Sequence, residues 1–326
     1  MKSSLTKSLR KQSFVNIKTT HISKAHSNMV DQKINPTPMK KETNFSTKGN
    51  KTDLGPLVIN RMLPNRFAKK VGPFVFMDYV APAIKETITK KGMGAHPHRG
   101  IATLTYILEG EVEHFDSAGN TGKIYSGGAQ WMKAGNGIMH DENFNYDSQT
   151  NSKIIHGLQL WINLPAKNKA EDPAHIAIQA EEIPKKTLLQ DAGWIKAIVG
   201  DYEELSSKIP NYSQQFLYHI HLEAHKNFSI NLTDDIEAAA FLTTQNAILN
   251  DSEFQAGELV EFGRKAGEIE IKNASKKSVD IILLGGEQYT EPMISEGPFV
   301  MNSKKEIIQA YRDFYDGKYG KIKFTM

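Results

Sequence analysis

Short apolar runs, separated by glycine and proline, dominate the chain from residue 54 onward. Residues 57–59 and 74–77 are such runs, and residues 156–164 form another that ends at Pro165. Residues 101–115 alternate loosely between apolar and polar positions across Glu109-Gly110, which predicts a hairpin, and residues 116–121 predict a further turn. Many short strands joined by glycine turns indicate a β-sandwich or a β-barrel.

A second series of strands is predicted after a polar stretch at residues 166–176. Five more apolar runs follow it, at residues 194–199, 216–222, 238–243, 258–262 and 279–284. The chain has 326 residues, which is enough for two domains of ordinary size. We therefore expect one domain at residues 51–168 and a second at residues 169–326.

The last predicted element is a helix at about residues 303–316. Ser303 followed by Glu306 fits a capping box at its start, and Gly317 suits its end. Apolar side chains recur between them at helical spacing, namely Ile307, Ile308, Tyr311, Phe314 and Tyr315. We expect this stripe to pack against a barrel.

Residues 1–50 differ from the rest of the chain in composition. They hold ten Lys or Arg and two acids, a net charge of +8, and because the whole chain carries +3, the other 276 residues carry −5. A segment rich in Lys, Ser, Thr and Asn cannot bury enough apolar surface to fold, so we expect a disordered basic tail. An organelle-import segment and a start at Met39 are the alternatives.

Composition narrows the compartment and the chemistry. The chain has no cysteine, which excludes disulfides and thiolate metal sites. No apolar run reaches about 18 residues, so no transmembrane helix and no membrane association are expected. The tail lacks the apolar stretch of a secretory signal, and we expect a cytoplasmic protein. The acidic body argues against direct nucleic-acid binding.

Metal-type side chains occur in two pairs, His96 with His98 and His140 with Glu142, each with one residue between. On a strand this spacing places both side chains on one face, whereas Pro97 disfavours a helix. Two such strands side by side would bring three imidazoles and one carboxylate to a common point. The pattern therefore predicts one metal site.

Imidazole and carboxylate ligands suit a single first-row metal. Iron, as Fe(II) or Fe(III), is expected first, with Mn, Ni, Cu or Zn as alternatives. Four ligands leave an open position on a metal that prefers five or six, which is typical of a catalytic or ligand-sensing site. Gly94 and Gly100 are expected to leave room for a bound molecule, and Ile138 and Phe144 to line an apolar pocket. Glu142 is a candidate ligand and a candidate catalytic base.

The other histidines are given different roles. His219 and His221 are expected to be polar positions on the outer face of a strand, in a second barrel without metal, because no histidine follows His225. His156 is near the metal motif in pattern and is a candidate support for it. The remaining histidines are expected to be solvated, namely His21, His26, His114 and His175.

Several motifs stand in a fixed order between about residue 54 and about residue 316. They are His96-Pro97-His98-Arg99-Gly100, Gly137-Ile138-Met139-His140-Asp141-Glu142 and residues 72–78, 130–132, 156–164 and 297–302. Together they resemble the pirin family. The resemblance implies an all-β fold of two cupin-type β-barrel (jelly-roll) domains, face to face, with one metal, usually iron, in the N-terminal barrel. In pirins the positions that match His96, His98, His140 and Glu142 are the metal ligands.

The resemblance also implies two classes of function. Some pirins resemble cupin quercetinases, which implies a quercetin 2,3-dioxygenase-like enzyme that opens flavonol-type or related enolic substrates with O₂, Glu142 taking the hydroxyl proton. Pirins are also implicated as redox-sensing regulators that bind transcription factors or metabolic enzymes. We expect the enzyme, a monomer whose partners are a small-molecule substrate and O₂. The regulator with a protein partner is the alternative.

Overall fold

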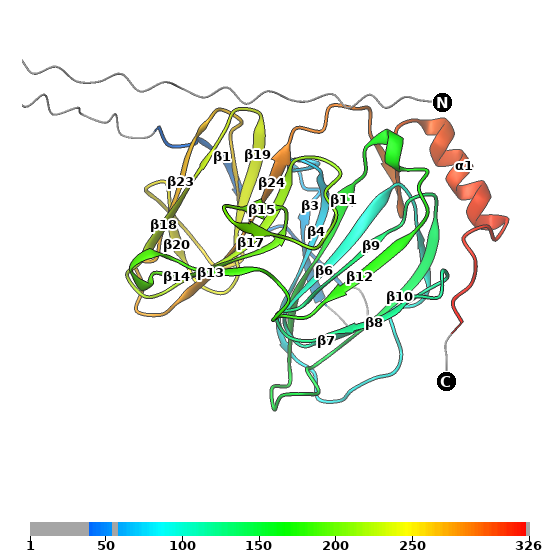
Figure 1. Cartoon of the computed structure of the whole chain (residues 1–326), viewed down its shortest axis with the longest axis horizontal. Helices are drawn as coiled ribbons and strands as arrows, with labels where there is room; N and C mark the ends of the chain where they lie inside the picture. The colour runs from blue at the N-terminus through cyan, green and yellow to red at the C-terminus, as the bar shows by residue number, and fades with distance from the viewer. Residues whose placement is uncertain (1–38, 54–57, 324–326) are drawn as a thin grey trace, which may run out of the picture. The chain divides into compact units, whose positions relative to one another are not determined.

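The computed structural model describes residues 39–53 and 58–323, and antiparallel strands make up most of them (Figure 1). They form two β-barrels, each with a sheet of seven strands and a sheet of four. A single α-helix occurs within the described residues, α1 (Lys304–Tyr315). The predicted all-β fold with two barrels and a C-terminal helix is thereby confirmed.

The first barrel contains the strands that carry the predicted metal ligands. Its large sheet has the order β12 (Ala174–Ile178), β9 (Ala129–Lys133), β6 (Ile101–Glu109), β11 (Ile154–Asn163), β4 (Phe74–Ile84), β3 (Val58–Leu63) and β2 (Asn50–Asp53). Its small sheet has the order β5 (His96–His98), β10 (Ile138–Asn145), β7 (Glu111–Asp116) and β8 (Thr121–Ile124).

The second barrel repeats this plan. Its large sheet has the order β1 (Thr43–Thr47), β22 (Leu259–Phe262), β19 (Ile236–Leu242), β24 (Val279–Glu287), β17 (Gln215–Leu222), β14 (Gly193–Val199) and β13 (Lys185–Thr187). Its small sheet has the order β18 (Asn227–Leu232), β23 (Gly267–Lys272), β20 (Ala247–Leu249) and β21 (Ser252–Phe254).

Short elements complete the described chain. Two-stranded ribbons are formed by β15 (Asp201–Tyr202) with β16 (Leu205–Ser206) and by β25 (Ile294–Glu296) with β26 (Phe299–Met301). Two 3-10 turns are η1 (Ala166–Asn168) and η2 (Leu189–Asp191). No helix within the described residues is long and apolar enough to cross a membrane.

The two large sheets pack against each other through one apolar core. Trp131 and Tyr106 of the first barrel belong to the same buried cluster as Leu217, Phe241 and Leu284 of the second. Strand β6 is buried over most of its length, because one of its faces lines the first barrel and the other meets the second barrel. Each large apolar side chain buried in this way contributes about 1.5–3 kcal/mol to stability.

The predicted hairpin across Glu109-Gly110 is wrong. Strand β6 ends at Glu109 in the large sheet, where it pairs with β9 and β11. Strand β7 begins at Glu111 in the small sheet, where it pairs with β10 and β8. The alternation of residues shows where the strand is interrupted. At this point the chain passes from the large sheet to the small sheet and does not turn back as a hairpin. The turn predicted at residues 116–121 does join two paired strands, β7 and β8.

Two strands lie across the predicted domain boundaries. Strand β1, from the segment expected to be disordered, pairs with β22 in the second barrel, with Thr47 opposite Leu259. Strand β12 lies beyond the predicted boundary at residue 168, yet it pairs with β9 of the first barrel. The predicted tail at residues 1–50 is therefore wrong for β1, and residues 1–38 lie outside the described part of the chain.

The C-terminal segment folds back onto the first barrel. Phe299 in β26 forms a bridge with Arg99, and Arg99 donates to Asp313 of α1 over 2.6 Å. Lys169 is buried, and its Nζ donates to the carbonyl oxygens of Gly100 (2.7 Å) and Val300 (2.8 Å). The segment therefore belongs in space to the first barrel, beside which α1 appears in red in Figure 1.

Helix α1 begins as the sequence predicts. Ser303 is its N-cap, and the side chain accepts from the backbone N–H of Glu306 over 3.3 Å. The predicted apolar stripe is only partly buried, since Ile307 is 2% exposed but Ile308 is 53% exposed and Tyr315 79%. The helix thus packs on the barrel through a narrower face than the spacing suggests.

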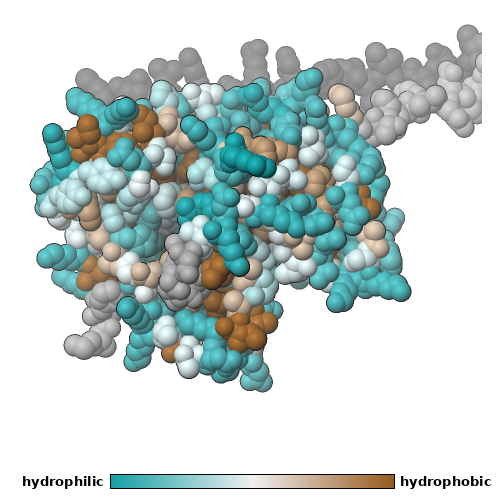
Figure 2. Space-filling view, turned by 180° about the vertical axis from the view of Figure 1, so that it is seen from behind, coloured by the Kyte–Doolittle hydropathy of each residue, from teal (hydrophilic) through white to brown (hydrophobic). Residues whose placement is uncertain are grey.

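Exposed apolar residues are dispersed over the surface. On the face shown in Figure 2, hydrophobic residues form small, separate patches among hydrophilic ones. The large hydrophobic side chains that are exposed come from many elements, namely Met39, Val58, Phe67, Ile84, Ile88, Met93, Leu189, Ile308 and Tyr315. Single exposed apolar residues of this kind are ordinary on globular proteins.

Removing β1 should destabilise the second barrel. A chain that begins after residue 47 loses the pairing with β22, and it loses the buried Lys41, whose Nζ donates to the carbonyl oxygen of Lys265 over 2.7 Å. We expect its Tm to lie several degrees below that of a chain beginning at residue 39, because an apolar sheet edge and a buried carbonyl become exposed. Equal Tm values for the two chains would show that β1 contributes no stability.

Candidate metal centre

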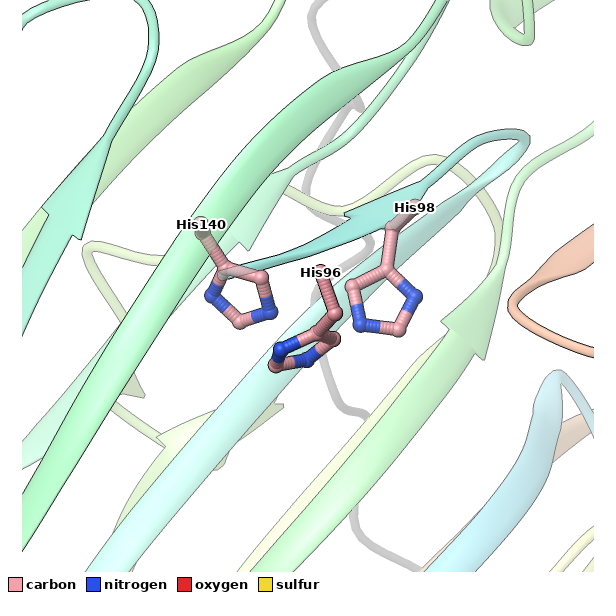
Figure 3. A group of neighbouring side chains, drawn as sticks. All are labelled: His96, His98 and His140. Atoms are coloured by element: carbon pink, nitrogen blue, oxygen red, sulfur yellow. The ribbon is translucent and has the colours of Figure 1, made fainter. Parts of the chain in front are cut away.

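Strand pairing brings the three predicted histidine ligands together. Strand β10 pairs with β5 so that His140 lies opposite His96 and Ile138 opposite His98. The ring centroids are 4.4 Å apart for His96 and His140, and 5.0 Å apart for His98 and His140. Figure 3 shows the three rings turned toward one another, and their nearest ring nitrogens lie within 4.8 Å of each other.

Glu142 lies on the other side of His140, in a second group of candidate ligands. On its second edge β10 pairs with β7, which places Glu142 opposite His114. Ligand atoms of His114, His140 and Glu142 lie within 4.8 Å of one another. The four predicted ligands thus fall into two groups that share His140, with His96 and His98 in one group and Glu142 beside His114 in the other.

Two of the imidazoles are oriented by backbone carbonyls. The Nδ1 of His96 lies 2.8 Å from the carbonyl oxygen of Gly94, and the Nδ1 of His98 lies 3.1 Å from that of Pro298. A carbonyl only accepts, so each Nδ1 carries the proton and each Nε2 keeps its lone pair. This is the arrangement that orients histidines toward a metal.

His140 has a different environment, which a cation would satisfy. Both of its ring nitrogens are buried without a hydrogen-bond partner in the described chain. Burial and the neighbouring His98 and His96 hold the pKa of His140 well below its usual value, and burial with His96 lowers the pKa of His98 to about 3. Neutral, buried and unpaired nitrogens are costly unless they ligate, so the donor set fits a bound metal.

The Glu142 carboxylate is fixed through one of its oxygens. Its Oε1 accepts from Gln130 Nε2 over 2.6 Å and from Thr105 Oγ1 over 2.9 Å. No hydrogen bond to Oε2 occurs among the residues that the structure describes. Glu142 therefore keeps one oxygen free to bind a cation or to take a proton, while the other holds its orientation.

A mainly apolar pocket of about 270 Å³ opens beside the histidines. Its walls include Phe76 and Trp161, whose rings stack at 4.1 Å and 10°, and Trp161 also meets His98 edge-on at 4.8 Å. The two rings give this side of the pocket an apolar, aromatic wall. The predicted Phe144 lines this pocket, but Ile138 does not and belongs to a buried cluster.

An ion pair closes one side of the pocket. Arg61 donates to both carboxylate oxygens of Asp78, over 2.6 and 2.9 Å, and its guanidinium lies 4.2 Å from the centre of the Phe76 ring. The bidentate pair balances its own charge. On this side, the pocket therefore presents polar groups to a ligand but no net charge.

The two glycines expected to leave room for a ligand differ in role. A Cβ on Gly94 would meet no atom within 4 Å, which agrees with open space near His96. A Cβ on Gly100 would lie 2.1 Å from the carbonyl oxygen of Val300, and its φ is +79°. Gly100 is therefore required where β26 crosses the barrel, and the prediction that it makes room for a bound molecule is wrong.

His114 is buried and His175 is half-buried, contrary to the expectation that both are solvated. His114 is 1% exposed, its Nε2 lies 3.3 Å from Asp116 Oδ2, and its ring stacks on that of His175 at 4.2 Å. The Nδ1 of His114 has no partner in the described chain. His114 and Asp116 are two residues apart on β7 and so share one face of the strand. Only the pairing of β7 with β10 shows that this face is turned into the barrel.

The histidines of the barrel interface are also more buried than predicted. His219 is 5% exposed and receives a hydrogen bond of 2.7 Å from Tyr106 of the first barrel. His156 contacts Tyr79, over 3.0 Å, rather than the metal ligands. The face of β17 that was expected to be outer is therefore the face turned toward the first barrel. His21 and His26 lie outside the described residues.

Sequence reasoning from the ligands alone misses the groups that hold them. Thr105, Gln130 and Pro298 each contact a predicted ligand and none has a metal-type side chain. Gln130 and Pro298 do fall within the motifs at residues 130–132 and 297–302. Their place in those motifs was the sequence signal that could have pointed to them, and no such signal marked Thr105.

Comparison with known proteins agrees with this architecture. The Pirin family model matches residues 57–162, and the Pirin C-terminal cupin domain model matches residues 217–320. The chain is 32% identical to human pirin over 233 residues, which are 70% of this chain and 78% of that protein. It is 30% identical to pirin-like protein 2 of Arabidopsis thaliana over 270 residues, 81% of this chain and 80% of that protein.

A solved structure is similar over most of the chain. The crystal structure of quercetin 2,3-dioxygenase from Acinetobacter baumannii matches with a TM-score of 0.79 and 28% identity, covering 87% of this chain and all of that one. The two family models together span both barrels, and the relatives match across them. The chain therefore belongs to the pirin family.

Proposed function

We propose that this protein is a metal-dependent dioxygenase that acts on flavonol-type, quercetin-like, or related enolic substrates. The observation that carries the proposal is the pocket of about 270 Å³, in which stacked aromatic rings and the candidate ligands His96, His98 and Glu142 share one space. A flat aromatic molecule fits such a wall, and its oxygen atoms would meet the ligand cluster. The similarity to a quercetin 2,3-dioxygenase supports the same reading.

We assign one mononuclear metal, iron first, to His96, His98, His140 and Glu142. Three neutral imidazoles and one carboxylate are the ligands that suit Fe among the first-row metals, with Mn, Ni, Cu and Zn as competitors. When bound, the iron supplies the redox and Lewis-acid chemistry that O₂ and an enolic substrate require.

The chain itself supplies binding, orientation and a proton acceptor. Phe76 and Trp161 give an aromatic substrate an apolar surface to pack on beside the candidate ligands. Glu142 would serve in turn as ligand and as base: when Oε2 does not hold the metal it can take the proton of the substrate hydroxyl, while Thr105 and Gln130 keep the carboxylate in place through Oε1. The substrate can bind as its anion only if an acceptor such as Glu142 takes the proton of its hydroxyl.

A regulatory role is the second candidate, and one contact favours it. His98 is bonded to Pro298, in the segment that leads to α1. A change in the charge of a metal held by His98 would act on this segment and on the exposed side of the helix, and so on a protein partner. The dioxygenase has the stronger support, because it accounts for the aromatic pocket, whereas a regulator would not require one.

Replacement of His140 by alanine should abolish tight iron binding. The protein would lose the one ligand common to both groups of candidate ligands, and the remaining donors would hold the metal far more weakly. Elemental analysis after anaerobic loading with Fe(II) measures this. The matched control is His225→Asn, at an exposed turn with positive φ that asparagine tolerates. Stoichiometric iron in His140→Ala would show that His140 is not a ligand of the metal.

Acid should destabilise the metal-free protein through its buried imidazoles. The pKa of His98 is lowered from 6.5 to about 3, so the unfolded chain binds more protons between these values and stability falls as the pH drops through them. At about pH 5 the loss is about 2 kcal/mol for His98 alone. Thermal melts from about pH 7 to about pH 5 should show a smaller drop in Tm for His98→Gln than for the wild type. Identical drops would contradict the buried, neutral state of His98.

Oxygen consumption with a panel of flavonols and catechols tests the enzymatic activity. The Fe(II)-loaded protein should consume O₂ and give a ring-opened product and carbon monoxide. Glu142→Gln should lower the rate per bound iron about 10²–10⁴-fold, because it removes the proton acceptor. Glu113→Gln is the control, a glutamate on the neighbouring strand β7. No turnover with any substrate, together with a partner captured in one iron oxidation state only, would favour the regulator.

A further inference from the structure

A second cavity lies between the two barrels, away from the candidate metal ligands. It has a volume of about 360 Å³ and is lined by residues of both barrels, namely Pro82, Leu108, Glu109, Ile154, His156, His219, Thr243, Thr244 and Asp280. Its lining shares no residue with the pocket beside the metal ligands. The function proposed above makes no use of it.

His156 presents an unpaired acceptor to this cavity. The hydroxyl of Tyr79 donates its one proton to the carbonyl oxygen of Thr243 over 3.1 Å, so it must accept from Nε2 of His156 over 3.0 Å. The Nδ1 of His156 then has no proton and no partner within the described chain, although the residue is only 8% exposed. Burial lowers the pKa of His156 to about 4, which keeps the ring neutral at physiological pH.

Asp280 adds a carboxylate whose hydrogen-bond partners are imidazoles. Its Oδ1 accepts from His219 Nε2 over 2.9 Å and from His221 Nδ1 over 2.7 Å. His219 is held in this tautomer by the hydroxyl of Tyr106, which donates to its Nδ1 over 2.7 Å. The Oδ2 of Asp280 makes no hydrogen bond to the part of the chain that the structure describes. One oxygen is therefore fixed, and the other is free for a ligand.

Glu109 gives the cavity a second carboxylate. It is half-buried at the end of β6, and its carboxylate has no hydrogen bond or ion pair with a described residue. The lining residues include no lysine or arginine. Lys196 stands on β14 opposite His219 but does not line the cavity. A cavity with two carboxylates, a free imidazole acceptor and no balancing cation favours a positively charged, donor-rich ligand.

The apolar part of the wall restricts the ligand further. Pro82, Leu108 and Ile154 offer a surface for an alkyl chain. A bare metal ion is less suited to the cavity, because its carboxylates and imidazoles do not form a group of three ligand atoms within 4.8 Å among the described residues. An ammonium group on an alkyl body satisfies both the acceptors and the apolar wall.

We propose that the cavity between the barrels binds a small organic cation, an aliphatic amine in its protonated form, whose N–H groups donate to Asp280, Glu109 and Nδ1 of His156. The alkyl part lies on Pro82, Leu108 and Ile154. Since the lining comes from both barrels, the bound amine also ties one barrel to the other, and it does so whether or not the metal site is an oxygenase.

Isothermal titration of the full-length, metal-loaded protein with putrescine and with spermidine tests this proposal. We expect saturable binding of at least one amine, weakened roughly ten-fold to a hundred-fold in Asp280→Asn and in Glu109→Gln, as for the loss of a charged hydrogen bond. Asp280→Asn retains an oxygen for His219 and His221, which favours correct folding, and circular dichroism checks it. Glu287→Gln, an exposed glutamate on the same strand β24 as Asp280, should bind like the wild type.

Two further titrants distinguish the amine from other ligands. 1,4-Butanediol has a body like that of putrescine without the charge, and we expect it not to bind. Binding of the diol as tight as that of putrescine, or the absence of saturable binding for both amines, would overturn the proposal. So would stoichiometric binding of Zn²⁺ in place of an amine, if it were lost in Asp280→Asn, because the cavity would then be a metal site.

Discussion

The antiparallel register of β10 with its two neighbours is the constraint on which the candidate metal centre depends. Pairing with β5 sets His140 opposite His96, and pairing with β7 sets Glu142 opposite His114. A shift by one residue would turn these side chains to the other face of the sheet. The hydrogen-bond ladder of one strand therefore fixes the donor set more firmly than any contact between the side chains, which have no mutual hydrogen bonds to hold them.

The C-terminal segment is the second support of this centre. Pro298 orients His98, Lys169 joins Gly100 to Val300, and Arg99 reaches Asp313 in α1. Each contact joins parts of the chain that are far apart in sequence. Contacts of this kind close long loops, so the C-terminal segment depends on the folded first barrel for the surface on which it docks.

The chain pattern predicted the elements that depend on local periodicity. The ligand pairs could be placed on strands because a period of two does not depend on the tertiary fold, and the start of α1 could be placed at Ser303 because capping is local. The pattern could not show which sheet a strand joins. For this reason β1 and β12 were assigned to the wrong domains, the break at Gly110 was interpreted as a hairpin, and the buried His114 was expected in solvent.

The contact between His98 and Pro298 also has a consequence for biosynthesis. A ribosome makes a protein from the N-terminus to the C-terminus, and domains generally fold in the same order. The strands that bear His96, His98, His140 and Glu142 emerge early, but the carbonyl that aligns His98 emerges only when the second barrel has been made. A nascent chain therefore lacks the contact that fixes His98 throughout the synthesis of the second barrel. A metal that arrived before the C-terminal segment had docked would meet His98 without the carbonyl that aligns it.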